Sequence, residues 1–183
     1  YNIKKNYFLF LGTLDPRKNL ERLVTAFEAF REKHGEGWQL VLAGREGAAA
    51  SRVYAQVMAS PARSDIIFTG YVEPDMVAPL LRGATALVAP SIYEGFGMPV
   101  TEALATGTPV ITSRFGSLPE VSTGAALFVD PYDINSIVAA MSELVSDSAK
   151  EADLRARGPE AARRYSWEQC ARETFQVYKE ILE

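Results

Sequence analysis

The sequence predicts an α/β fold built on a doubly wound parallel sheet. Apolar segments of strand length alternate along the chain with longer segments whose apolar residues recur at helical spacing. The first apolar segment, Tyr7 to Leu11, is uninterrupted and ends at Gly12, which is typical of a strand buried on both faces. Two loops, one at Gly12 and one around Glu94, directly follow predicted strands. In such sheets ligands bind outside the carboxyl ends of the strands, so we expect both loops at that edge.

The remaining elements follow in order. Asn19 is placed to cap a helix whose apolar residues recur from Leu20 to Phe30. The later elements are a strand at 38–43, a weaker helix at about 49–59, a strand at 65–69, a short helix at 75–81, a strand at 84–89, a helix after the Glu94 loop that Gly107 stops, strands at 109–112 and 126–129, a helix capped by Asp133, and two closing helices, the last opened by Ser166 and Gln169 as a capping box.

The most informative segment is 91–102, which reads S-I-Y-E-G-F-G-M-P-V-T-E. It places Glu94 before a Gly-Phe-Gly turn and Glu102 after it, in the first turn of the helix that follows. Pro99 suits the first helical position, because its fixed φ matches a helix start and its missing N–H would have no partner there. Helix starts present unpaired N–H groups, and glycines let an anion approach the backbone closely. The segment therefore predicts a phosphate site with an acid on each side, which suggests a bound sugar nucleotide whose ribose hydroxyls Glu102 would bind.

This segment resembles the E-x7-E motif of retaining glycosyltransferases of family 4, which have the GT-B fold. Further segments follow the family pattern in the expected order across nearly the whole chain: G-T-L-D-P-R-K-N from Gly12, F-T-G-Y-V from Phe68, A-T-G-T-P-V-I from Ala105, G-S-L-P-E-V from Gly116 and Y-S-W from Tyr165. The Pro-Arg-Lys-Asn form of the first segment is similar to bacterial mannosyl- and rhamnosyltransferases.

The resemblance implies the C-terminal half of a GT-B fold, a Rossmann-like domain that binds the sugar donor. At 183 residues the chain has room for one domain. We therefore expect residues 1–183 to form a single nucleotide-sugar-binding domain, with 166–183 as its closing helix. The N-terminal acceptor-binding domain of such an enzyme is expected outside this chain.

The resemblance also assigns roles to residues. Lys18 falls where the family has a phosphate-binding lysine, and Glu94 is expected to face the transferred sugar. The family often has an arginine directly after the first glycine; here that residue is Thr13, and Arg17 is a candidate to supply the charge. The candidate catalytic residues are Glu94, Lys18 and Arg17, and the candidate substrate-binding residues are Gly12, Thr13, Tyr71, Glu94, Gly95, Phe96, Gly97, Met98 and Glu102.

Each of these residues also has a purely structural explanation. Arg17 and Lys18 could be solvated charges at a helix start, although the helix dipole disfavours cations there. Glu102 could simply satisfy that dipole, and Glu94 could cap the glycine-rich turn. The ring of Phe96 is expected to pack beneath the loop, while its backbone N–H faces phosphate. For Tyr71 the sequence leaves two roles open: bordering the base of the nucleotide, or covering the end of the sheet. The roles of Ser91 and Tyr93 are undecided in the same way.

The function implied is transfer of a sugar, with retention of the α configuration, to a glycan or lipid-linked acceptor in polysaccharide biosynthesis. A GDP-mannose-like donor is favoured over a UDP-sugar, and the isolated domain is expected to be nearly inactive. The alternatives are a non-catalytic module that binds a nucleotide sugar, and another GT-B enzyme such as a sugar-nucleotide epimerase. Hydrolysis by the two glutamates is disfavoured, and a dinucleotide dehydrogenase is not supported because G-x-G-x-x-G is missing after Gly12.

The composition restricts the kinds of partner and the cellular location that we expect for this protein. A net charge of −4 disfavours broad nucleic-acid binding, which needs a basic face. The single cysteine, Cys170, fits a reducing compartment, and no apolar run approaches the ~20 residues of a membrane span. We therefore expect a cytoplasmic protein, with peripheral association at the inner face of the membrane as an alternative for the complete enzyme. The sequence shows no metal-ligand cluster, so neither a metal nor another cofactor is expected beside the donor.

Overall fold

A computed structural model describes residues 1–182 and contains one six-stranded sheet. All strand pairs are parallel, and the spatial order is β3-β2-β1-β4-β5-β6. The strands are β1 (Asn6–Leu11), β2 (Trp38–Ala43), β3 (Ile66–Gly70), β4 (Ala86–Ala89), β5 (Val110–Ser113) and β6 (Leu127–Val129). The predicted doubly wound parallel sheet is confirmed, and its predicted strands agree with the observed ones to within two residues at either end.

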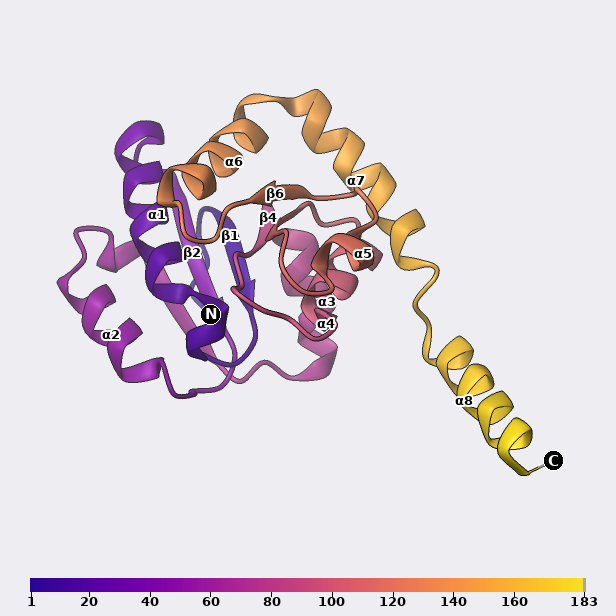
Figure 1. The fold of residues 1–183 in the computed structure, drawn as a ribbon. Coiled ribbons are helices and arrows are strands. Elements are labelled where there is room, and N and C mark those ends of the chain that lie inside the picture. The colour runs from indigo at the N-terminus through magenta and orange to yellow at the C-terminus, as the bar shows by residue number, and fades with distance from the viewer. Residues whose placement is uncertain (183) are drawn as a thin grey trace.

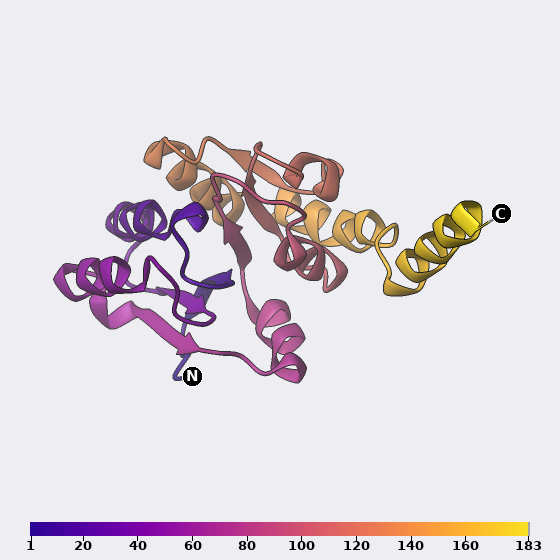
Figure 2. The ribbon, with the colours of Figure 1, turned by 60° about the horizontal axis from the view of Figure 1, so that its bottom comes forward.

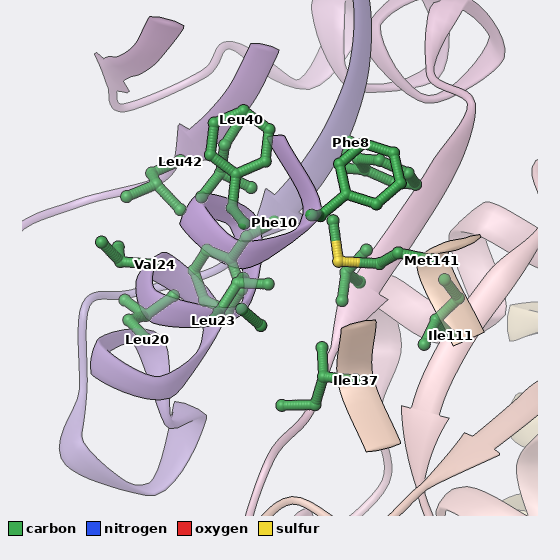
Figure 3. Packing of buried hydrophobic residues seen from close by; sticks show 14 of the residues in the cluster. Phe8, Phe10, Leu20, Leu23, Val24, Leu40, Leu42, Ile111, Ile137 and Met141 are labelled. Atoms are coloured by element: carbon green, nitrogen blue, oxygen red, sulfur yellow. The ribbon is translucent and has the colours of Figure 1, made fainter. Parts of the chain in front are cut away.

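Helices cover both faces of this sheet (Figures 1 and 2). One face packs against α1 (Leu20–His34), α2 (Ala50–Ala59) and α6 (Ile134–Ser146). The other packs against α3 (Pro74–Gly83), α4 (Met98–Ala105), α5 (Leu118–Ser122) and the end of α7 (Ser148–Ala162). The alternation of strand side chains explains the two cores, since Phe8 and Phe10 enter the first and Leu9 enters the second. Figure 3 shows the first core, where Phe10 of β1 lies among Leu20, Leu23 and Leu40.

The sheet order fixes where the predicted loops lie. β1 and β4 are neighbours, although the chain forms β2 and β3 on one side before crossing back to form β4 on the other. The loops after β1 and β4 therefore leave the same edge of the sheet, side by side. Such a switch point leaves a crevice between neighbouring loops and is the usual ligand site of open α/β sheets.

Three details of the prediction need correction. The helix α5 was not predicted, because its five residues are too short to display a helical period. Asn19 precedes α1 but does not cap it through its side chain, which reaches other loops instead. Helix α4 begins at Met98, so Pro99 is its second residue and Glu102 its fifth, beyond the first turn where the sequence reading had placed it.

Other helix ends agree with the sequence. Asp133 accepts a hydrogen bond from the backbone N–H of Asn135 and so caps α6. Gly107, at φ 71°, follows the end of α4. Ser166 accepts from the N–H of Gln169, but the side chain of Gln169 turns to Glu173, so only half of the predicted capping box forms.

The last helix, α8 (Trp167–Leu182), stands away from the rest of the domain in both ribbon views (Figures 1 and 2). The helix was expected to close the domain, yet every one of its residues is exposed. Within residues 1–182, no helix combines the length and the apolar character needed to cross a bilayer.

Candidate functional site

The two loops at the switch point are joined by backbone and side-chain contacts. The N–H of Ile92 donates to the carbonyl oxygen of Arg17 over 2.8 Å. A small cavity lies between the loops, lined among others by Lys18, Ser91, Glu94, Gly97 and Leu118. The structure thus brings together the predicted phosphate-binding residues and the predicted sugar-facing glutamate.

Glu94 is the centre of this arrangement, with only 7% of its surface exposed. Its carboxylate accepts hydrogen bonds from Lys18 Nζ at 2.5 Å, from Arg17 Nη1 at 2.8 Å and from Ser91 Oγ at 2.8 Å. Burial alone would raise the pKa of Glu94, but the bonds from Lys18, Ser91 and Arg17 outweigh it and lower the pKa below its usual value. Glu94 is therefore held as a carboxylate.

The loop after β5 holds the Glu94 backbone in place. Gly116 has φ +63°, and a Cβ on it would lie 2.3 Å from the carbonyl oxygen of Glu94. The N–H and hydroxyl of Ser117 both donate to that same oxygen. Only glycine allows this close approach, which explains the Gly-Ser pair at the start of a segment that the sequence singled out.

Asn19 fastens the other side of the site. Its amide Nδ2 donates to the carbonyl oxygens of Pro90 and Pro131, which belong to the loops after β4 and β6. Its backbone adopts φ 63°, a left-handed conformation that asparagine tolerates better than most residues. The function of Asn19 is to join three loops, a role that its position before a helix did not reveal.

The Gly-Phe-Gly turn leaves its backbone donors unused. None of the N–H groups from Gly95 to Met98 donates a hydrogen bond to an acceptor within residues 1–182. Gly97 precedes α4 with φ 91°, so these donors stand at a helix N-terminus with its positive dipole end. This is the environment that binds phosphate groups in proteins.

The side chains of Phe96 and Met98, in this turn, are both partly exposed to solvent. The ring of Phe96 is 40% exposed and packs edge-to-face against Tyr165, with 5.2 Å between the ring centroids. The sequence favoured packing of this ring beneath the loop; the contact seen is with Tyr165, and Phe96 stays considerably exposed. Met98, the first residue of α4, is 43% exposed.

Among residues 1–182, Glu102 differs from Glu94 in having no side-chain partner. Its side chain makes no hydrogen bond or ion pair within residues 1–182, and partial burial raises its pKa. Because Glu102 lies beyond the first turn of α4, stabilisation of the helix dipole does not explain it. A half-buried carboxylate without a partner is what a ligand's hydroxyl groups would satisfy.

The loops after β1, β2 and β3 meet on the other side of the site. Gly12 lies beside Lys18, and a Cβ on Gly44 would lie 1.9 Å from the carbonyl oxygen of Gly12. Thr13, after Gly12, is exposed, and its methyl group faces Gly47. The close approach of the β1 and β2 loops therefore depends on a glycine that the sequence reading did not single out.

Tyr71 follows β3 at the same edge and is 49% exposed. The guanidinium of Arg45 lies 4.4 Å from the centroid of its ring, a cation–π contact. Sequence reasoning missed Arg45, although its position directly after the glycine that follows β2 parallels that of Thr13 after Gly12. The pair presents an exposed aromatic and cationic surface at the same edge of the sheet as the turn from Gly95 to Met98.

A second hollow lies at the amino ends of β1, β2 and β3. Its acid, Asp65, already accepts hydrogen bonds or ion pairs from Lys5 at 2.6 Å and Arg31 at 3.1 Å. No group of three metal-ligating side chains occurs in the part of the chain from 1 to 182.

The chain can now be compared with known proteins. The sequence profile of the family described as "Glycosyl transferases group 1" matches residues 2–163. The chain belongs to the group 1 glycosyltransferase family. The structural elements that carry this match include both loops of the site and the helix α4.

Members of this family with known names are similar over nearly the whole chain. O-antigen chain mannosyltransferase B of Escherichia coli is 34% identical over 175 residues, which cover 96% of this chain and 46% of that protein. The MMP alpha-(1->4)-mannosyltransferase of Mycolicibacterium hassiacum is 32% identical over 187 residues, 97% of this chain and 44% of that protein. The chain thus spans less than half the length of these two relatives.

Among solved structures, sucrose-phosphate synthase from Thermosynechococcus elongatus superposes with a TM-score of 0.88 at 29% identity. The alignment covers 98% of this chain and 46% of that one. The structural neighbours are glycosyltransferases of the GT-B fold, which confirms the Rossmann-like, GT-B assignment made from sequence.

Proposed function

We propose that this chain is the donor-binding domain of a retaining glycosyltransferase that uses a GDP-mannose-like sugar nucleotide. Membership of the family and the names of the two mannosyltransferase relatives support the transferase and the sugar. The single observation that carries the donor site is the pair of unlike carboxylates, Glu94 and Glu102, on either side of a turn with unused N–H donors.

The diphosphate of the donor would lie on the turn from Gly95 to Met98, with Lys18 and Arg17 facing it. Transfer leaves a nucleoside diphosphate, whose growing negative charge is stabilised by fixed cations and backbone N–H groups. Gly12, next to Lys18, leaves space for the phosphates near the β1 loop. In this proposal the two cations and the helix dipole act where other enzymes use a metal ion.

The nucleoside would extend from the diphosphate toward β2 and β3. Glu102 is the candidate acceptor for the two ribose hydroxyls, since its carboxylate is half-buried and has no partner in residues 1–182. Thr13 and Tyr71 would border the nucleoside, with Arg45 over the Tyr71 ring.

Binding of the diphosphate would also change Glu94. Lys18 and Arg17 now donate to its carboxylate, and a diphosphate competes for the same donors. Glu94 then has lone pairs available for hydroxyl groups of the sugar, while Ser91 keeps it oriented. Donor binding thus prepares the sugar-facing carboxylate.

Acceptor binding is assigned to a further domain of the complete enzyme, as in a two-domain GT-B protein. The two mannosyltransferases named above are about twice the length of this chain, which supports this reading. The acceptor would be a glycan or a lipid-linked glycan, and association with a membrane would depend on that further domain.

The proposal is tested by titrating the chain with GDP-mannose and with UDP-glucose in a calorimeter. We expect GDP-mannose to bind more tightly, with GDP alone retaining most of the affinity. If only UDP-glucose binds, the donor is a UDP-sugar and not a GDP-sugar. If neither sugar nucleotide binds to a chain shown to be folded, the donor-binding role is contradicted.

A further inference from the structure

Two exposed aromatic rings beside the site are not used by the proposed donor contacts. Phe115, in the loop after β5, is 44% exposed, and Tyr132, in the loop after β6, is 53% exposed. Their ring centroids lie 6.1 Å apart and the rings meet edge-to-face. The guanidinium of Arg22, from α1, lies 5.3 Å from the Tyr132 centroid. These three residues are called the aromatic platform below.

The aromatic platform is fastened to the residues that build the donor site. Phe115 precedes Gly116, whose backbone lies against the carbonyl oxygen of Glu94. Tyr132 follows Pro131, whose carbonyl oxygen accepts from Asn19, and Arg22 donates to the amide oxygen of the same asparagine over 2.9 Å. Phe115 is therefore next in sequence to a residue that packs against Glu94. Tyr132 is next in sequence to a residue that binds Asn19, the neighbour of Lys18.

The order of the strands places the platform relative to a bound donor. Tyr71 and Arg45 follow β3 and β2, Lys18 and Glu94 follow β1 and β4, and the two platform rings follow β5 and β6. Along this edge the proposed donor runs from its nucleoside at β3 and β2 to its sugar at Glu94. The platform is the next surface beyond the sugar.

The chemistry of the platform suits a saccharide. A pyranose ring has an apolar C–H face, which packs on aromatic rings, and a rim of hydroxyl groups, which accept hydrogen bonds from a guanidinium. Exposed aromatic rings otherwise lie unfavourably in water, and these two are held in place without being covered.

We propose that Phe115, Tyr132 and Arg22 form a subsite for a sugar ring of the acceptor glycan. This inference rests on the proposed function, because the donor sugar at Glu94 defines the side from which an acceptor approaches. The proposed function assigned acceptor recognition to the further domain alone. With this subsite, the donor-binding domain contributes to acceptor recognition as well.

The test is a ligand-observed NMR titration of the 183-residue chain with α-linked mannotriose in the presence of saturating GDP. We expect saturation transfer to the trisaccharide in the wild type. Phe115→Ala and Tyr132→Ala should each weaken its binding by about 5- to 10-fold, in keeping with the loss of one aromatic contact. Tyr132→Phe keeps the ring and should retain most of the binding.

The control is Tyr178→Ala, which removes an aromatic ring that is 60% exposed on α8. It should leave mannotriose binding unchanged, and unfolding midpoints should show that all variants are folded. Equal mannotriose affinity in the wild type and both alanine variants, or no binding to the wild type, would overturn the inference.

A parallel GDP titration of the same samples separates this inference from the proposed function. GDP binding that is equal in all variants, together with ring-dependent mannotriose binding, supports both. GDP binding without mannotriose binding overturns the platform alone. Ring-dependent mannotriose binding without any GDP binding would support the platform and overturn the donor role.

Discussion

Glu94 and Glu102 belong to one short segment, yet their surroundings are opposite. Glu94, in the loop after β4, accepts hydrogen bonds from three side chains and has a lowered pKa. Glu102, on α4, has no side-chain partner within residues 1–182 and has a raised pKa. Within residues 1–182 the protein therefore satisfies one carboxylate by itself and leaves the other without a side-chain partner. The difference indicates that the Glu94 carboxylate stabilises the fold, whereas ionisation of Glu102 destabilises it. Under the proposed function, this cost of Glu102 would be offset by contacts with the donor.

The largest expected effect is on Glu94. Glu94→Ala leaves the Lys18 ammonium, which is 7% exposed as a residue, without a counter-charge. Breaking a buried ion pair from one side costs about 3–5 kcal/mol, and the exposure of Arg17 favours the lower figure. Urea denaturation should show a loss of about 3 kcal/mol in the free energy of unfolding.

A matched control is Glu160→Ala, which breaks an exposed pair with Arg163. Exposed pairs contribute about 0–1 kcal/mol, so this variant should unfold nearly as the wild type does. Similar losses in the two variants would mean that the contacts around Glu94 do not stabilise the fold. The double variant Lys18→Met with Glu94→Leu should recover much of the loss, since no buried charge remains.

The lowered pKa of Glu94 also predicts a pH dependence. A carboxyl group whose pKa is lower in the folded state stabilises the fold above its unfolded pKa, about 4.5, and loses this contribution as the pH falls through the folded pKa. Stability measured from pH 7 to pH 2 should therefore fall below pH 4.5, and it should fall less steeply in Glu94→Gln. Identical slopes in the two proteins would contradict the assignment.

The next effect concerns the loop that holds Glu94. Gly116→Ala would place a Cβ 2.3 Å from the Glu94 carbonyl oxygen, at a backbone φ that alanine also disfavours. Gly124→Ala shares a positive φ but meets no atom within 4 Å, so it isolates the cost of the conformation alone. Conformational strain costs about 1–3 kcal/mol, and we expect Gly116→Ala to exceed Gly124→Ala by a further ~1–2 kcal/mol in thermal or urea unfolding. Equal losses of stability in the two variants would show that the loops after β4 and β5 move apart to accommodate the added Cβ.

The smallest expected effect on stability has the opposite sign. Because the pKa of Glu102 is raised in the folded state, ionisation of Glu102 is destabilising, and this penalty appears as the pH rises through the folded pKa. Glu102→Gln should therefore increase the free energy of unfolding at pH 7, by less than any of the changes above, and make no difference at pH 3. A loss of stability at pH 7 would show that Glu102 has a structural partner.

Much of this comparison could be predicted from the sequence, and part of it could not. The continuous apolar run before Gly12 and the later alternation of elements were sufficient to predict the parallel sheet, and hence the edge at which both loops lie. The approach of Lys18 to Glu94 could not be predicted as an ion pair, since the sequence suggested a phosphate as the counter-charge.

The contacts that were missed join residues far apart in the chain. Asn19 looked like a helix cap because of the residues that follow it, but its amide bonds to Pro90 and Pro131. Arg45 lies outside every motif that the sequence analysis singled out, and its contact with Tyr71 exists only because β2 and β3 are adjacent in the sheet. Local signals specify turns and helix ends, whereas the partners of polar side chains depend on the tertiary fold.

The most direct test of the central claim is a calorimetric titration of GDP into the wild type, Glu102→Ala and the control Glu180→Ala. If Glu102 binds the ribose, its removal should weaken GDP binding by about 1–3 kcal/mol, or roughly 5- to 150-fold, while the protein remains fully folded. The control, on the exposed helix α8, should bind as the wild type does. Unchanged GDP affinity in Glu102→Ala would contradict the claim that this carboxylate is reserved for the donor.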